Sequence, residues 1–262
     1  MQSKSPKSSS RNIKLTLEYD GSRFFGFQRQ PSKPTIQSAL EQAFSELFDR
    51  PTKIRAAAGR TDSGVHAKGQ VVNFETASRL SPAQIQKGLN AHLPQEIVVK
   101  EAREVPAQFH ARYGARWKTY EYLVWNSSVR SPLLDGRAFQ FRYPLNLKRM
   151  REAGRELMGR RDFKAFQSTG SNVRTSRRLV QRLEIEKEGN LVRFTVTADG
   201  FLYRMVRRIV GALLEVGRGA LSLKAFREGF QRGGFAEKAL SVSPQGLCLA
   251  SVEYRRKGKV AN

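Results

Sequence analysis

The sequence predicts an α+β protein made of two similarly built halves whose sheets join. Each half alternates strand-type stretches with about two helical stretches, although no internal sequence repeat is visible. The length of 262 residues suits two domains of ordinary size, and 39% hydrophobic residues are enough for a core. The expected division is a disordered basic tail over 1–11, an N-terminal domain over 12–105, a C-terminal domain over 106–255 and a basic tail over 256–262.

The first half carries two helix signals between strand signals. Thr35 and Ser81 are predicted N-caps, and the apolar residues behind them follow a helical period to Phe48 and to about Asn90. Alternating or β-branched residues predict strands over 12–17, 54–58, 70–74 and 97–100.

The second half shows strand and helix signals in a similar proportion. Strands are predicted over 117–126, 179–186, 191–197 and 246–254, and helices over 145–158, 201–216 and 223–230. Tyr120, Tyr122 and Val124 are expected on one buried strand face. The polar stretch from Gln167 to Arg178 is long and rich in arginine, which favours a binding loop over a solvated connector.

Charge restricts the class of partner. Lysine and arginine number 47 against 23 acidic residues, giving a formal net charge of +24. Such an excess favours a polyanionic partner. The basic residues are spread along the chain instead of lining one amphipathic helix, which disfavours a membrane surface.

Aromatic rings and arginines alternate between Tyr19 and Gln30. Phe24, Phe25 and Phe27 are interleaved with basic residues there, a pattern that suits stacking on bases and contact with phosphates. The alternative is a hydrophobic loop that plugs the core.

Other chemistries find little support. Cys248 is the only cysteine and lies in an apolar run, so we expect a small buried side chain in a reducing cytoplasm. The three histidines lack metal-ligand spacing, and no phosphate-binding loop or dinucleotide fingerprint is present. No apolar stretch has the length of a membrane span or the form of a signal peptide. We therefore expect no metal, no cofactor and no membrane.

One acidic loop stands out within residues 58–74. Arg60 precedes Asp62 by two residues, and Gly59 and Gly64 flank the pair before a strand-type run begins. A carboxylate on a tight, cation-lined loop beside a sheet is a candidate catalytic group. The alternative is an Arg–Asp pair that closes a surface turn.

The stretch Gly-Arg-Thr-Asp-Ser-Gly-Val-His-Ala, residues 59–67, resembles the active-site signature of the tRNA pseudouridine synthase A family. That family usually has alanine where Ser63 stands. Further stretches match in the expected order, and the resemblance covers roughly residues 12–255. They lie at 19–30, 88–94, 117–126, 205–207 and 246–254.

The resemblance implies two halves with mostly antiparallel sheets joined around a central basic cleft. It implies that Asp62 is the catalytic carboxylate, attacking either the sugar or the base. Tyr120 would stack on the target base, and Leu247 would exclude water. We expect Arg207 to pair with Asp62 and Arg60 to contact RNA, although sequence does not separate these two roles.

The implied activity is isomerisation of uridine to pseudouridine at positions 38, 39 and 40 of the tRNA anticodon stem-loop, on a flipped base. The family also implies a cytoplasmic homodimer that needs no cofactor. Two alternatives stay open. One is a non-catalytic RNA-binding protein such as a chaperone, and the other is a synthase of the same family that acts on other RNAs.

Overall fold

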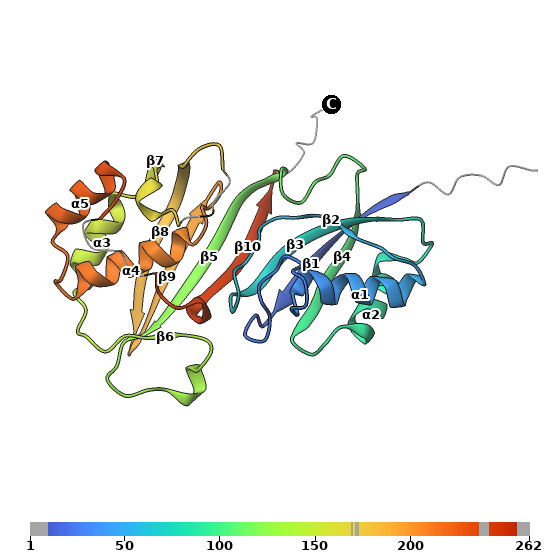
Figure 1. The fold of residues 1–262 in the computed structure, drawn as a ribbon, viewed down its shortest axis with the longest axis horizontal. Coiled ribbons are helices and arrows are strands. Elements are labelled where there is room, and N and C mark those ends of the chain that lie inside the picture. Colours follow the sequence, from blue (N-terminus) through green and yellow to red (C-terminus); the bar gives the residue numbers. More distant parts are fainter. Residues whose placement is uncertain (1–9, 169, 171–172, 236–240, 256–262) are drawn as a thin grey trace, which may run out of the picture.

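The computed structural model describes residues 10–168, 170, 173–235 and 241–255, which form an α+β fold as predicted (Figure 1). The predicted C-terminal tail and residues 1–9 lie outside the described residues. Arg11 corrects the predicted N-terminal tail, because it already belongs to the first strand and pairs with Glu104 at 2.7 Å.

Ten strands in the described part of the chain form one sheet. They are β1 Arg11–Tyr19, β2 Ile54–Ala57, β3 His66–Thr76, β4 Ile97–Val105, β5 Ala115–Trp125, β6 Phe139–Gln140, β7 Gly159–Asp162, β8 Arg177–Glu188, β9 Leu191–Ala198 and β10 Leu247–Tyr254. Their order is β4-β1-β3-β10-β5-β9-β8-β7, with β2 beside β3 and β6 beside β5. Only the β3–β10 and β5–β6 pairs are parallel among them.

The helices gather at the two ends of the sheet. They are α1 Ile36–Phe48, α2 Pro82–His92, α3 Leu147–Arg155, α4 Met205–Gly217 and α5 Leu223–Arg232. Figure 1 shows α1 and α2 with the strands of the first half and α3, α4 and α5 with those of the second, with β5 and β10 between the two groups. The two halves thus share one continuous sheet.

The starts of α1, α2 and α5 agree with the sequence prediction, and those of α3 and α4 lie later than predicted. Thr35 and Ser81 accept backbone N–H bonds from the first turns of α1 and α2, as their N-cap signals predicted. The helix predicted from Phe201 begins only at Met205, because Arg204 has the left-handed φ of 59°. Residues 203–204 therefore form a turn before the helix.

Two further differences concern the polar stretch after α3. Arg177 and Arg178 belong to β8 and not to the predicted loop, since they pair with β7. The four-residue β7, Gly159–Asp162, was not predicted because it carries no alternating apolar residues.

The helix predicted over 145–158 is shorter in the structure. It spans Leu147–Arg155 and begins after the cap at Asn146.

The predicted core faces are buried. Tyr120, Tyr122 and Val124 of β5 are each less than 9% exposed, in agreement with the expected alternation. Met205, Ile209, Leu213 and Val216 of α4 are also buried, as the helical spacing predicted. The α4 residues pack in the same core as β5, which fixes the helix start beside Tyr120.

The two halves meet where β10 lies between β3 and β5. Its parallel register with β3 covers only two pairs, Cys248 with His66 and Leu249 with Ala67. Cys248 is half-buried instead of buried, and burial raises the pKa of its thiol to about 11. Gly69 of β3 approaches the same strand so closely that an added Cβ would lie 2.7 Å from the carbonyl oxygen of Ala250.

We expect Gly69→Ala to lower the free energy of unfolding by about 1–3 kcal/mol, because the methyl group forces β10 away from β3. Urea denaturation followed by circular dichroism measures the loss. Gly234→Ala is the matched control, since nothing lies within 4 Å of its added Cβ. Equal stability losses for the two variants would contradict the tight junction.

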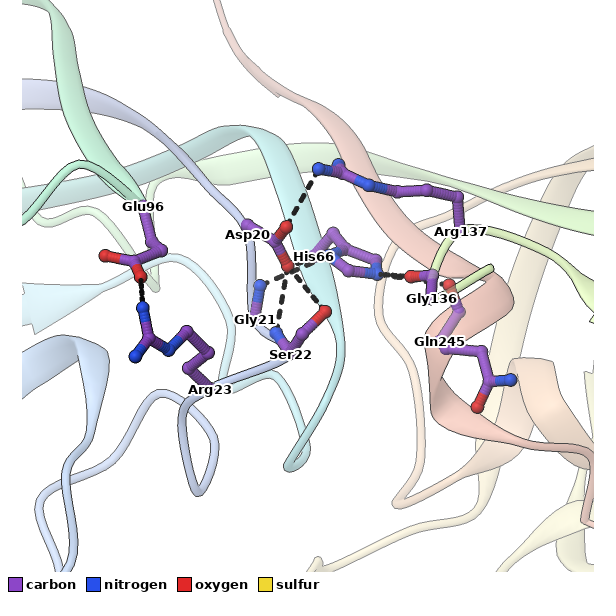
Figure 2. A network of polar contacts seen from close by, with 9 residues as sticks. All are labelled: Asp20, Gly21, Ser22, Arg23, His66, Glu96, Gly136, Arg137 and Gln245. Atoms are coloured by element: carbon purple, nitrogen blue, oxygen red, sulfur yellow. Dashed lines mark hydrogen bonds and ion pairs between the residues drawn. The ribbon is translucent and has the colours of Figure 1, made fainter. Parts of the chain in front are cut away.

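A polar network beside this junction joins loops of both halves (Figure 2). His66 Nδ1 accepts the N–H of Gly21 at 3.2 Å. The same Nδ1 lies 3.1 Å from Oδ1 of Asp20, and Nε2 lies 2.9 Å from the carbonyl oxygen of Gly136 and 3.1 Å from that of Gln245. One buried imidazole thus ties the first half to two separate loops of the second.

Asp20 adds a second connection in the same network. Its Oδ2 accepts from Arg137 at 2.8 Å, and its Oδ1 accepts the hydroxyl and the N–H of Ser22 (Figure 2). The ion pair crosses from the loop after β1 to the loop before β6. Together with His66, it joins the two halves.

Candidate active site

A cleft with a volume of about 1210 Å³ lies between the two halves. This exceeds the usual range of small-molecule pockets, roughly 300–1,000 Å³. Among the described lining residues, Asp62 is the only acid. The basic lining residues are Lys33, Arg55, Arg60, Arg112, Lys118, Arg204 and Arg207.

The loop that carries Asp62 is fixed by backbone contacts with the aromatic stretch after β1. The N–H of Phe27 donates to the carbonyl oxygen of Thr61 at 3.0 Å, and Val65 N–H closes a turn onto Asp62 at 3.1 Å. Gly26, with a φ of 87°, permits this approach, because an added Cβ would lie only 2.9 Å from the Thr61 oxygen.

Two buried polar side chains that the sequence reasoning missed hold the start of this loop. Gln70 is fully buried, donates to the carbonyl oxygen of Gly59 at 2.9 Å and accepts the N–H of Val71 at 3.1 Å. The hydroxyls of Tyr19 and Thr61 lie 2.8 Å apart. A glutamine inside the apolar strand run was the available signal, because a buried amide needs partners.

Arg207, and not Arg60, is paired with Asp62. The Arg207 Nη1 lies 3.3 Å from the Asp62 Oδ2, and its Nε donates to the carbonyl oxygen of Val242 at 2.7 Å. Arg207 is only 8% exposed. Arg60 is exposed at the cleft. The expected pairing of Arg207 with Asp62 agrees with this geometry, and the contact of Arg60 with RNA stays a prediction.

Burial dominates the ionisation of Asp62. Loss of solvent raises the pKa of its carboxyl, and the charges of Arg207 and Arg204 together with the Arg207 hydrogen bond oppose the rise without cancelling it. The sequence predicted a nearby arginine that holds this acid charged, and Arg207 does favour the charged form. The raised pKa shows that desolvation outweighs the pairing.

Tyr120 and Leu247 line the same cleft. The Tyr120 ring is 8% exposed and meets the Phe201 ring edge to face, with centroids 4.9 Å apart. Burial raises the pKa of Tyr120, so its hydroxyl remains protonated at neutral pH. Leu247 lies on β10 opposite Tyr122 and is 6% exposed. All the predicted site residues thus gather around one space.

Side chains of three elements hold the segment before β10 that forms one wall of the cleft. Arg207 binds the carbonyl oxygen of Val242, Tyr122 donates to that of Ser243 at 2.6 Å, and His66 binds that of Gln245. The wall is therefore positioned by α4, β5 and β3 together. His66 belongs to the same nine-residue signature as Asp62.

The aromatic stretch, residues 19–30, was predicted either to contact nucleic acid or to plug the core, and its rings divide between a buried and an exposed position. Phe24 and Phe27 are buried and complete the core, whereas Phe25 is 45% exposed and lines the cleft. Arg23 and Arg29 form ion pairs with Glu96 and Glu41 and are not among the lining residues.

Within the described residues, no group of three or more His, Cys, Asp or Glu side chains is placed to bind a metal ion. No helix in that part of the chain has both the length and the apolar character needed to span a membrane.

A cationic cleft around one half-buried carboxylate is typical of a protein that binds a polyanion and acts on it. A family model described as tRNA pseudouridine synthase matches residues 16–114 and 153–255. The chain belongs to the tRNA pseudouridine synthase family, whose members are isomerases that act on uridine in tRNA. The sequence-based family assignment is therefore confirmed.

Relatives match over almost their whole length. The tRNA pseudouridine synthase A of Methylacidiphilum infernorum is 44% identical over 242 residues, covering 92% of this chain and 94% of that protein. The tRNA pseudouridine synthase A 2 of Clostridium perfringens is 43% identical over 244 residues, covering 93% of this chain and 100% of that protein. The tRNA pseudouridine synthase A of Neisseria gonorrhoeae is 41% identical over 242 residues, covering 92% of this chain and 91% of that protein.

Proposed function

We propose that the protein converts uridine to pseudouridine in tRNA, with Asp62 as the catalytic carboxylate. The observation that carries this proposal is the pairing of a largely buried Asp62 with Arg207 inside a cationic cleft. Membership of a family of tRNA pseudouridine synthases supports the reaction type.

The reaction requires little beyond what this cleft offers. The bond from ribose C1′ to uracil N1 breaks, the base turns while it is held, and C5 bonds to C1′. C5 loses its proton and N1 gains one, so the change is redox-neutral. Asp62 attacks either the sugar or the base, and either route needs the ionised carboxylate.

The neighbours of Asp62 have distinct roles in this proposal. Arg207 orients the carboxylate, and its charge favours the ionised form by lowering the pKa of Asp62. The ring of Tyr120 stacks on the uracil while it is free of the sugar, and its hydroxyl is a proton donor. Leu247 excludes water that would hydrolyse a covalent intermediate. Arg60 lies exposed at the cleft, where it contacts the RNA backbone.

The target nucleotide leaves its stack to reach this carboxylate. Extrusion costs a few kcal/mol, least in a loop or at a weak stem end. Contacts between the basic cleft and RNA phosphates offset that cost and make binding strongly salt-dependent. These requirements fit uridines 38, 39 and 40 of the anticodon stem-loop, which the family resemblance implies as targets.

The experiment that tests the function is tritium release from tRNA transcripts labelled at C5 of uridine. Release is expected, because C5 exchanges its hydrogen for the bond to C1′. Mapping of the modified positions separates the anticodon stem-loop from other RNAs. Absence of release over a full range of salt concentrations contradicts the proposal. The cytoplasmic homodimer implied by the family stays a prediction, and sedimentation of the purified protein tests its subunit number.

The raised pKa of Asp62 predicts an acid limb in the pH profile. Only the ionised carboxylate reacts, so kcat/KM falls as the pH is lowered through the pKa of Asp62 in the free protein. That limb is expected above the range of an ordinary aspartate, about 3.9, because burial raises the pKa. Tritium release measured across pH checks this. A midpoint at or below the ordinary value would contradict it.

A further inference from the structure

A second group of charges surrounds Lys118, on the strand that carries Tyr120; of its members, Lys118 and Arg112 line the cleft, and Arg178 and Asp199 do not. Lys118 stands two residues earlier on β5 and lines the same cleft. The two side chains leave the same face of the sheet about 7 Å apart along the strand. Lys118 therefore lies close to the ring of Tyr120, on which we place the uracil.

The charged groups that face Lys118 come from three elements. They are Arg112 from the turn before β5, Arg178 from β8 and Asp199 just after β9. The cross-strand neighbours of Lys118 on β9 and β10 are apolar. Two cations and one acid thus surround a third cation.

The acid is already engaged by other groups. Asp199 Oδ1 accepts the N–H of Leu179 at 2.9 Å, and its Oδ2 lies 3.7 Å from Arg160. The side chain of Lys118 makes no hydrogen bond or ion pair with any residue that the structure describes. Arg178 is fixed in place, because its Nη1 donates to the carbonyl oxygen of Thr175 at 2.8 Å.

This arrangement is unfavourable without a counter-anion. The pKa of Lys118 is lowered to about 8. Burial is the largest cause, and repulsion from Arg112 and Arg178 adds to it. An anion that binds Lys118 from the cleft would offset the repulsion from Arg112 and Arg178 and would accept from the unpaired ammonium group. Phosphate oxygens suit the site, since they accept from lysine and from guanidinium groups alike.

We propose that Lys118 and Arg112, with the charge of nearby Arg178 adding to theirs, form a phosphate-binding subsite that holds the RNA backbone next to the target nucleotide. The inference rests on the proposed function. If the uracil stacks on Tyr120, the short distance from Tyr120 to Lys118 makes the phosphate bound at Lys118 a neighbour of the reacting nucleotide. The subsite fixes the RNA backbone on one side of the target nucleotide while its base turns over Asp62.

The subsite makes RNA binding dependent on pH through a lysine. Binding to phosphate requires the protonated ammonium, so RNA binding takes up a proton whenever Lys118 is neutral in the free protein. The protonated fraction of a group with a pKa of about 8 falls about tenfold between about pH 7 and about pH 9. The affinity for tRNA is therefore expected to fall by up to about tenfold over the same pH interval.

The test measures the dissociation constant of an unmodified tRNA transcript for the full chain and three variants. Lys118→Gln removes the charge, and Lys118→Arg keeps a charge that does not titrate in this range. Lys187→Gln is the control, since it removes an exposed lysine of β8 that does not line the cleft. Thermal unfolding of each variant confirms that it folds.

We expect Lys118→Gln to weaken binding about tenfold near pH 7 and to lower the salt slope by about 0.7–0.9, the value for one phosphate contact. Lys118→Arg should restore the affinity and abolish the pH dependence above about pH 7. Lys187→Gln should match the wild type. An unchanged affinity and slope in Lys118→Gln would overturn the subsite, as would a pH dependence that persists in Lys118→Arg.

Tritium release by the wild type separates this inference from the proposed function. Proton-linked tRNA binding without release at any pH would leave the subsite standing and reject the activity. Release by a Lys118→Gln variant with wild-type affinity would support the activity and reject the subsite.

Discussion

Asp62→Asn is expected to lower tritium release by at least about 10³-fold while tRNA still binds, because an amide is neither a nucleophile nor a base. The variant keeps the size of the side chain and an oxygen that accepts from Arg207. Binding depends on the cationic lining of the cleft, which the substitution leaves intact. Tritium release and tRNA affinity measured on the same preparation separate the two effects.

Asp49→Asn is the matched control for this variant. Asp49 ends α1 with a left-handed φ of 50°, a conformation that asparagine adopts readily, and it does not line the cleft. Its activity should equal that of the wild type. If Asp62→Asn kept wild-type turnover, the catalytic role of Asp62 would be rejected. A wild-type protein that binds tRNA but shows no turnover would instead favour a non-catalytic RNA-binding protein.

Arg207→Ala is expected to reduce both stability and activity. The free energy of unfolding should fall by about 3 kcal/mol, because the change leaves the half-buried Asp62 carboxylate and the Val242 carbonyl without their partner. Activity should fall about 10²-fold as the carboxylate loses its orientation. Urea denaturation and tritium release measure the two losses.

The same variant should move the acid limb of the pH profile. The charge of Arg207 is the largest effect that lowers the pKa of Asp62, so its removal raises that pKa further and shifts the limb to higher pH. Arg207→Lys retains a charge but not the two-pronged contact, and should fall between the wild type and alanine. Arg182→Ala, which breaks an exposed ion pair with Glu184 on β8, should change little.

The sequence predicted the elements whose signals are local. The caps at Thr35 and Ser81, the alternation along β5 and the apolar stripe of α4 depend on side chains within a few residues of one another. All of these agree with the structure. The start of α4 was misplaced because the left-handed φ of Arg204 leaves no mark in the apolar spacing.

The site was predictable in its residues and only partly in its contacts. The family signature pointed to Asp62, Tyr120, Arg207 and Leu247 together, and the structure places them around one cleft. The hydrogen bonds that hold this cleft join residues far apart in sequence. Examples are Gln70 with Gly59 and His66 with Gln245, which no local pattern indicates. The balance that raises the pKa of Asp62 also depends on burial, which spacing does not report.

The position of β10 has a consequence for how the chain folds. It is synthesised after every other strand of the sheet, yet it lies between β3 and β5. Each half can acquire its own pairings early on the ribosome, but the union of the halves waits for residues 247–254. Such distant pairings are slow to form, because much of the chain must be ordered before they add stability. We expect the last kinetic phase of refolding to be the one in which tRNA affinity appears.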